Sequence, residues 1–218
     1  MKTYDAVLFD LDGTLLNTIG DLAAAVNVAE ESFGYPKHSV AEIQSMVGNG
    51  IRKLLARAIP DGENNPNLDA VLAKFVEYYT AHVAVKTDYY PGIRQLVETL
   101  SAKGIKMAIV SNKFQNGSEI LRERFFADTI PVVYGDHPSR ERKPATDAPF
   151  GAMKELGVAP ERTLYVGDSQ VDAQTAENAG LDYVLVDWGF CPRADLEKWN
   201  PITIISEPSA LLEFFLDR

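Results

Sequence analysis

Two aspartates separated by a single residue follow a short apolar run near the start of the chain. The run Ala6–Phe9 is followed by Asp10, Asp12, Gly13 and Thr14. An uninterrupted apolar run of this kind predicts a strand buried on both faces, as in a parallel sheet. Because side chains at i and i+2 of an extended segment point the same way, Asp10 and Asp12 should face one crevice at the strand's end. A carboxylate there can serve as a nucleophile.

Polar side chains also follow later apolar runs. Ser111 follows one run, Asp168 and Asp172 follow another, and Lys143 precedes a proline in a charged loop between two predicted strands. All strands of a parallel sheet point one way, so these strand ends should meet at one edge of the sheet. The sequence therefore predicts one site assembled from segments that lie far apart in the chain.

The residue types expected at that edge favour one kind of chemistry. Asp10, Asp12 and Asp168 offer hard oxygen ligands of the kind that suits Mg²⁺. Without a cation, three clustered carboxylates would repel one another and raise their pKa values. Ser111, Lys143 and the turn amides after Asp10 are donors for an anion. A metal, a carboxylate nucleophile and anion donors together indicate phosphoryl transfer.

Composition and charge limit the partners. The chain has 218 residues with 46% hydrophobic and 24% charged residues, values that are ordinary for a soluble globular protein. Its net charge of −10 disfavours nucleic acid or an anionic membrane as the main partner, although a bound cation would still admit a phosphorylated small molecule. Cys191, the one cysteine, permits no internal disulfide, and no signal peptide or membrane-spanning stretch is recognisable. We expect a cytoplasmic protein.

The order of the expected elements predicts two domains. Strands and helices alternate after residue 86, which indicates a doubly wound, Rossmann-like parallel α/β sheet. Only helical patterns occur in residues 17–85, where the sequence 18–21 resembles a capping box and Gly48-Asn49-Gly50 interrupts a helix. We therefore expect a core domain of residues 1–16 plus 86–218 and an inserted all-helical cap of residues 17–85. The later strands are expected at 106–110, 131–134, 163–166, 182–186 and 202–205, with a helix from Pro208.

Four segments carry a resemblance to a known family. They are Asp10-x-Asp12-Gly13-Thr14, Ser111-Asn112-Lys113, Lys143-Pro144 and Gly167-Asp168-Ser169-x-x-Asp172. Their order and spacing resemble the motifs of the haloacid dehalogenase-like hydrolase superfamily, and within it the phosphoglycolate phosphatase group with a small helical cap. The resemblance covers essentially the whole chain. It departs at residues 145–146, where Ala-Thr stands in place of the family's frequent Asp-Pro.

The resemblance implies a role for each matching residue. Asp10 would attack phosphorus and form an aspartyl-phosphate. Asp12 would protonate the leaving alcohol and then activate the water that cleaves the intermediate, because each half-reaction reverses the proton demand of the other. Mg²⁺ would be held by the Asp10 side chain, the Asp12 backbone carbonyl and Asp168.

The resemblance also implies the groups that hold the substrate. Ser111 and Lys143 would grip phosphate oxygens, and Asp172 would support the metal shell or Lys143. The helical cap would close over the site and exclude water. The remaining residues expected to contact the substrate are Gly13, Thr14 and Asn112 in the core and Gly48, Asn49 and Gly50 in the cap.

Structural explanations stand beside these roles. Asp168 and Ser111 could be helix caps, Lys143 could belong to a solvated charged loop, and the Gly48–Gly50 segment could be a simple helix break. Among functions, a Mg²⁺-dependent phosphatase for a small phosphorylated metabolite, with 2-phosphoglycolate as a family-level candidate, ranks first. A phosphotransferase such as a sugar phosphomutase is the alternative. A receiver-type phospho-aspartate domain ranks lower because receivers lack the inserted helical block. A dehalogenase is disfavoured by Asp12, and the oligomeric state is left open.

Overall fold

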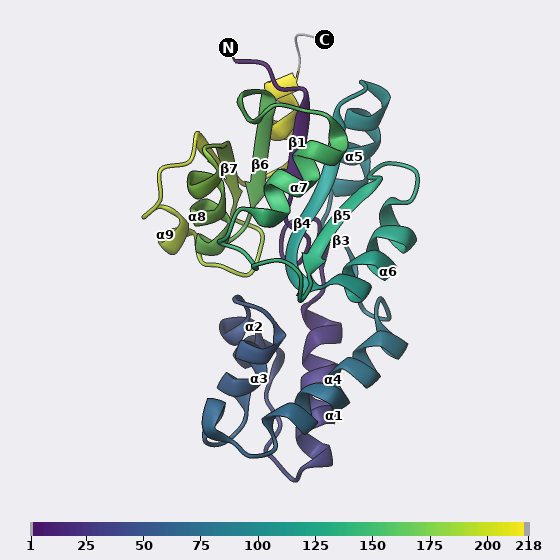
Figure 1. Ribbon diagram of the computed structural model, residues 1–218, viewed down its shortest axis with the longest axis vertical. Helices are drawn as coiled ribbons and strands as arrows, with labels where there is room; N and C mark the ends of the chain where they lie inside the picture. The colour runs from purple at the N-terminus through teal and green to yellow at the C-terminus, as the bar shows by residue number, and fades with distance from the viewer. Residues whose placement is uncertain (1, 216–218) are drawn as a thin grey trace.

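The computed structural model describes residues 2–215 and contains a six-stranded sheet in which every neighbouring pair is parallel (Figure 1). The strand order is β5-β4-β1-β6-β7-β8. This confirms the predicted doubly wound sheet. The strands are β1 (Ala6–Phe9), β4 (Lys106–Phe114), β5 (Val132–Asp136), β6 (Thr163–Gly167), β7 (Asp182–Val186) and β8 (Thr203–Ile205).

Helices cover both faces of the sheet because each strand presents apolar side chains in both directions. In β1, Val7 and Phe9 pack into one apolar cluster and Leu8 into the other. The first cluster is covered by α5 (Ile93–Ala102), α6 (Gln115–Phe126) and the 3₁₀ helix η3 (Pro208–Phe215). The second is covered by α7 (Asp147–Leu156), α8 (Gln170–Ala179) and α9 (Arg193–Leu196), and the short 3₁₀ turn η2 (Pro160–Arg162) precedes β6.

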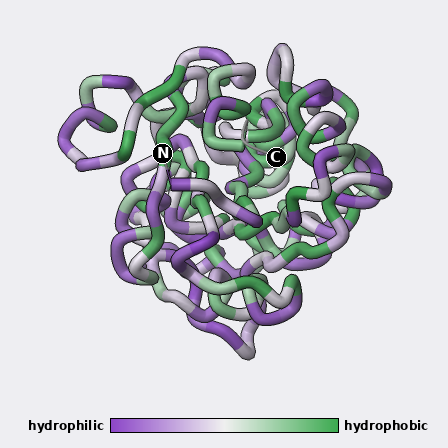
Figure 2. The backbone as a smooth tube through the Cα atoms, turned by 90° about the horizontal axis from the view of Figure 1, so that it is seen from above, coloured by the Kyte–Doolittle hydropathy of each residue, from purple (hydrophilic) through white to green (hydrophobic). Residues whose placement is uncertain are grey.

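A separate group of helices lies beyond the carboxyl ends of the strands (Figure 1). We call it the helical layer; it comprises α1 (Ile19–Ser32), α2 (Val40–Met46), α3 (Ile51–Ala58), the 3₁₀ turn η1 (Gly62–Asn64) and α4 (Leu68–His82). Hydrophilic segments lie mostly around the outside of the molecule (Figure 2). None of the helices in residues 2–215 is long and apolar enough to cross a bilayer. The domain boundaries at residues 16/17 and 85/86 stay a prediction.

Two adjacent strands join the helical layer to the sheet. β2 (Leu16–Asn17) and β3 (Asp88–Tyr89) pair antiparallel, so the outgoing and returning chains run side by side. Asp21 of α1 accepts hydrogen bonds from the backbone N–H groups of Lys86 and Thr87 and from the Thr87 hydroxyl, at 2.7–3.0 Å. One buried carboxylate therefore ties the start of α1 to the returning chain.

The structure corrects several local predictions. The capping box at residues 18–21 is wrong, because the Thr18 hydroxyl donates to Asp12 and makes no cap bond, while Asp21 bonds to the returning chain. Strand β4 continues to Phe114 through a shift of register. The segment from Pro208 forms a 3₁₀ helix. At Thr18 and Asp21, contacts with residues outside the helix therefore replace the hydrogen bonds of the expected capping box.

Candidate active site

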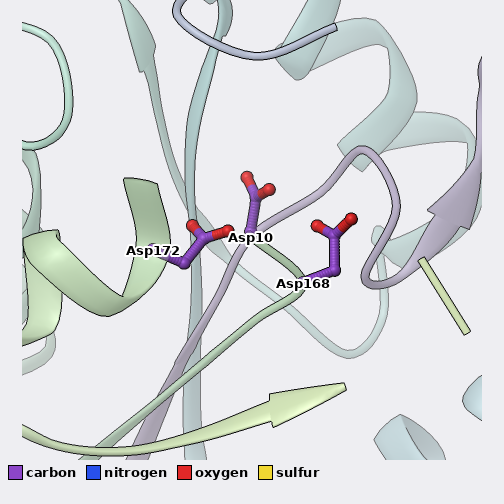
Figure 3. A group of neighbouring side chains, drawn as sticks. All are labelled: Asp10, Asp168 and Asp172. Carbon is purple, nitrogen blue, oxygen red and sulfur yellow. The ribbon is translucent and has the colours of Figure 1, made fainter. Parts of the chain in front are cut away.

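Three buried carboxylates meet at the carboxyl edge of the sheet (Figure 3). Asp10 follows β1, Asp168 follows β6, and Asp172 lies in the first turn of α8. One oxygen of each lies within 4.8 Å of the others. The sheet thus brings together Asp10 and Asp168, which the sequence places at separate strand ends.

Backbone and glycine contacts fix the Asp168 side chain. Its carboxylate accepts hydrogen bonds from the Thr14 hydroxyl at 3.1 Å and from the backbone N–H of Phe190 at 2.7 Å. A Cβ added to Gly13 or Gly189 would lie 2.3 Å from the carboxylate oxygen Oδ2 of Asp168. Both positions therefore need glycine, and the Thr14 hydroxyl, expected at the substrate, is committed to holding Asp168.

Lys143 contacts two of the three carboxylates, Asp10 and Asp172. Its ammonium donates to Asp10 Oδ1 at 2.9 Å and to Asp172 Oδ1 at 2.8 Å. It also contacts the Val110 carbonyl at 2.9 Å and the Tyr165 hydroxyl at 3.2 Å. Lys143 is only 4% exposed, so the alternative of a solvated charged loop is wrong for this side chain.

Asp172 already has hydrogen-bond donors on both of its oxygens. Oδ1 accepts from Lys143 and Tyr165, and Oδ2 accepts from the backbone N–H and hydroxyl of Ser169. Little acceptor capacity remains for a metal ion. These contacts favour Asp172 as the support of Lys143, leaving Asp10 and Asp168 as the carboxylates available to a cation.

The electrostatics of the cluster favour an added positive charge. Burial and the nearby Asp172 raise the pKa of Asp10 to about 7, although Lys143 opposes the shift. Burial together with Asp172 and Asp10 also raises the pKa of Asp168. Lys143 alone therefore does not compensate the buried carboxyl groups when all of them are ionised. Two adjacent carboxylates of raised pKa, with oxygens close together, fit the hard-oxygen donor set of a divalent ion.

The Asp12 side chain has different partners. Its carboxylate accepts from the Thr18 hydroxyl at 2.6 Å and from the Lys113 ammonium, whose Nζ lies 3.0 Å from Oδ1 and 3.3 Å from Oδ2. Reasoning from the sequence assigned no role to Lys113. The sequence does indicate that Lys113 lies near the site, because it stands two residues after Ser111 in an extended segment and should share the same face.

A cavity of about 630 Å³ lies between the sheet edge and the helical layer. It brings together most of the predicted site residues: Asp10, Asp12, Ser111, Asn112, Lys143 and Asp168 from the core, and Gly48, Asn49 and Gly50 from the helical layer. Gly13 and Thr14 are not among its lining residues. The Asn112 side-chain amide donates to the Lys143 carbonyl, while its oxygen is buried without a partner among residues 2–215.

One segment of the cavity wall was missed from the sequence. Phe190, Cys191 and Pro192 follow β7 and line the cavity together with the helical layer. The Phe190 carbonyl lies 3.5 Å from the side-chain nitrogen of Gln44 on α2. The rule that ligands bind beyond the carboxyl ends of strands applies to β7 too and could have found this segment.

The Gly48–Gly50 segment of the helical layer contacts the loop between β5 and α7. Its three residues have φ values of +115°, +55° and +82°. The Asn49 carbonyl accepts from Arg142 at 3.2 Å, and a Cβ on Gly50 would lie 2.6 Å from the Arg142 guanidinium. With ψ at 168°, Gly50 occupies a backbone region that is essentially restricted to glycine.

Replacing Gly50 should alter the preference among substrates more than the rate of the phosphoryl-transfer step itself. For the phosphatase chemistry that the sequence predicts, we expect Gly50→Ala to change kcat/KM for an alkyl phosphate by about tenfold, and for p-nitrophenyl phosphate by about threefold or less, because the loop lines the cavity and an added Cβ would force it or Arg142 to move. Gly34→Ala is the matched control, since Gly34 has φ +71° but nothing within 4 Å of an added Cβ. Equal losses on both substrates in Gly50→Ala would mean that the loop is only structural.

The fold and the site together define a class of enzyme. A parallel α/β sheet carries, at one strand edge, two carboxylates available to a cation and a buried lysine held by a third carboxylate. These groups line a cavity that the helical layer covers. This is the arrangement of a phosphoryl-transfer enzyme.

The chain belongs to the haloacid dehalogenase-like hydrolase family, whose model matches residues 7–186. It is 34% identical over 213 residues to a phosphoglycolate phosphatase of Chromobacterium violaceum, covering 95% of this chain and 96% of that protein. It is 30% identical to an N-acetylmuramic acid 6-phosphate phosphatase of Pseudomonas aeruginosa, covering 98% and 95%. The chain is accordingly a phosphoric monoester hydrolase.

Solved structures agree with this assignment. A candidate phosphoglycolate phosphatase from Lactobacillus delbrueckii subsp. bulgaricus superposes with a TM-score of 0.91 at 33% sequence identity, covering 97% of this chain and 98% of that one. The parallel sheet and its helices are therefore the family fold, as the resemblance implied.

Proposed function

We propose that this chain is a Mg²⁺-dependent phosphatase that releases phosphate from a small phosphorylated metabolite through an aspartyl-phosphate on Asp10. The observation that carries the proposal is the contact set of Asp10, which is buried beside the Lys143 ammonium and within ion-binding distance of Asp168. Because relatives are named phosphoglycolate phosphatase, 2-phosphoglycolate is the first substrate to test.

The first half-reaction joins Asp10 to phosphorus. A carboxylate oxygen of Asp10 forms the new bond as the bond from phosphorus to the alkoxy oxygen breaks. Asp12 gives its proton to that departing oxygen. Lys143 and the Ser111 hydroxyl hold the non-bridging oxygens, so the developing charge meets donors already in place.

The second half-reaction releases phosphate. Asp12, now ionised, takes a proton from a water molecule as the water attacks phosphorus. The bond from phosphorus to the Asp10 oxygen breaks, which regenerates the carboxylate. The proposed cap of residues 17–85 excludes other water while the leaving group is bound and admits it afterwards.

The Asp10 and Asp168 side chains and the Asp12 backbone carbonyl would hold Mg²⁺. The ion, when bound, supplies positive charge between the Asp10 carboxylate and the phosphate. Within the protein itself, Lys143 performs part of this neutralisation, and Asp172 keeps Lys143 in place.

A phosphate-release screen tests the proposal. The purified protein is incubated with Mg²⁺ and 2-phosphoglycolate, sugar phosphates, nucleotides or pyrophosphate, and free phosphate is measured. Release from at least one small phosphomonoester supports a phosphatase. Transfer of the phosphoryl group to a second sugar hydroxyl without free phosphate would favour the phosphotransferase alternative.

Metal binding should compete with protons. Since the pKa of Asp10 is raised to about 7 and that of Asp168 is raised as well, the apparent Mg²⁺ affinity should fall by at least about tenfold for each pH unit below 7 as these carboxylates take up protons. Titration calorimetry between about pH 5.5 and pH 8 measures this dependence. EDTA should abolish activity and Mg²⁺ should restore it. A pH-independent affinity, or full activity in EDTA, would contradict the assignment of the cation site.

A further inference from the structure

Lys113 is a buried cation that the proposed reaction leaves without a task. It is 8% exposed and lies in β4, two residues beyond Ser111. Its ammonium contacts both oxygens of Asp12. It also lies 4.5 Å from the centre of the Tyr79 ring. Lys113 thus contacts a residue proposed for proton transfer and a residue of the helical layer at once.

The contacts of Lys113 restrict the direction of the Asp12 carboxylate. The Thr18 hydroxyl bonds to Oδ1, while Lys113 bridges Oδ1 and Oδ2. Donors on both oxygens oppose rotation of the carboxylate plane. A general acid must point at the oxygen it protonates, and small errors of placement cost large factors in rate.

Strand β4 carries both Ser111, the proposed phosphate donor, and Lys113, the residue that contacts Asp12. Ser111 and Lys113 share a face of the extended segment, and the Lys113 backbone N–H donates to the Ser111 hydroxyl at 3.2 Å. Ser111 lines the same cavity as Asp10, while the Lys113 ammonium contacts Asp12. The proposed phosphate donor and the Asp12 contact therefore keep a fixed spacing.

Tyr79 connects Lys113 to the helical layer. This buried side chain of α4 stacks on Phe75, which lines the cavity, at 5.4 Å between ring centres, and meets the edge of Phe114 at 5.9 Å. Burial disfavours the charged form of Lys113, but the nearby Asp12 outweighs burial and raises the pKa of Lys113. The side chain is therefore a cation facing an aromatic ring away from water, where such contacts are strongest.

We propose that Lys113 is a positioning residue that aims the Asp12 carboxylate for proton transfer, and that the Tyr79 ring makes this aim depend on where the helical layer lies. The inference rests on the proposed function, since it assigns a partner to the proposed proton-transfer group. Correct seating of the layer over a substrate and correct placement of Asp12 then occur together.

The test compares substrates that differ in their need for a proton. Release of p-nitrophenolate needs little protonation, whereas an alkoxide leaves only when protonated. In Lys113→Met we expect kcat for the best alkyl phosphate of the screen to fall roughly 10- to 100-fold, while first-turnover p-nitrophenolate release changes by about threefold or less. Both measurements use one preparation, so their ratio does not depend on the folded fraction. Lys154→Met, at an exposed position of α7, is the matched control and should keep the wild-type ratio.

A second pair of variants changes Tyr79, the residue of the helical layer that contacts Lys113. Tyr79→Leu removes the ring and leaves Asp12 and Lys113 intact, so it should shift the alkyl-to-aryl ratio in the same direction by about three- to tenfold. Tyr79→Phe keeps the ring and should keep the ratio. This pair decides the question even where Lys113→Met fails to fold.

Three results separate the possible failures. Equal loss on both substrates in Lys113→Met and Tyr79→Leu, or no loss on either, would overturn the positioning role. An unchanged ratio in Tyr79→Leu beside a shifted ratio in Lys113→Met would overturn the link to the helical layer. If Asp12→Asn itself leaves the ratio unchanged, the proposed function of Asp12 fails.

Discussion

Asp10→Asn should reduce turnover of every phosphomonoester by about 10⁴-fold or more, because an amide oxygen is a poor nucleophile toward phosphorus. The fold should survive, because Lys143 keeps its ion pair with Asp172 at 2.8 Å. Free phosphate release under saturating Mg²⁺ gives the rate, and intact mass after acid quenching shows whether the phosphorylated protein still forms.

The thermal stability of Asp10→Asn shows whether its loss of activity comes from the missing nucleophile or from unfolding. The pKa of Asp10 is raised from 3.8 to about 7, so the folded protein binds this proton more tightly than the unfolded chain does. Ionisation of Asp10 therefore lowers stability as pH rises between those two values, and the asparagine variant should melt at the same temperature as the wild type or higher at neutral pH. Asp128→Asn, on the exposed turn after α6, is the control and should keep full activity. Turnover by Asp10→Asn near the wild-type rate would exclude Asp10 as the nucleophile.

Asp12→Asn should have the second largest effect, a loss of about 10²–10⁴ in kcat on alkyl phosphates, the usual contribution of general acid–base catalysis. Asparagine keeps the shape and can still accept from the Thr18 hydroxyl, but it cannot exchange a proton. KM should change by about threefold or less, because Asp12 is assigned to the proton and not to the phosphate.

The two half-reactions respond differently to this change. With p-nitrophenyl phosphate, the first turnover of Asp12→Asn should be nearly normal and the second should be slow, so phosphorylated protein should accumulate. Rapid-quench measurement of the phosphorylated fraction detects this. A variant with normal steady-state turnover, or one in which the first turnover is lost as completely as the second, would contradict the assigned role.

The parallel sheet was predictable because its signal is local and repeated. Apolar runs such as 163–166 and 182–186 end at polar residues, and the observed strands begin at the predicted residues. Convergence of Asp10 and Asp168 followed from strand direction alone, because every strand of a parallel sheet ends at the same edge. Their catalytic and metal-binding roles stay predictions.

Contacts between distant segments were not predictable in the same way. Asp21 carries the signature of a helix cap, yet it bonds to Lys86 and Thr87 across the linkers. Thr14 has a hydroxyl close to the proposed nucleophile in sequence, yet that hydroxyl is turned to Asp168. A short polar side chain has several possible partners, and only the packed fold decides among them.

The pairing of Leu16 with Tyr89 brings the two ends of the helical insertion next to each other. A segment whose ends are neighbours can be exchanged as a cassette without lengthening any loop of its host. Because Asp21 bonds to the chain at Lys86 and Thr87, a graft from a relative needs to carry those two residues with it. Such chimaeras would let one phosphoryl-transfer scaffold accept new leaving groups.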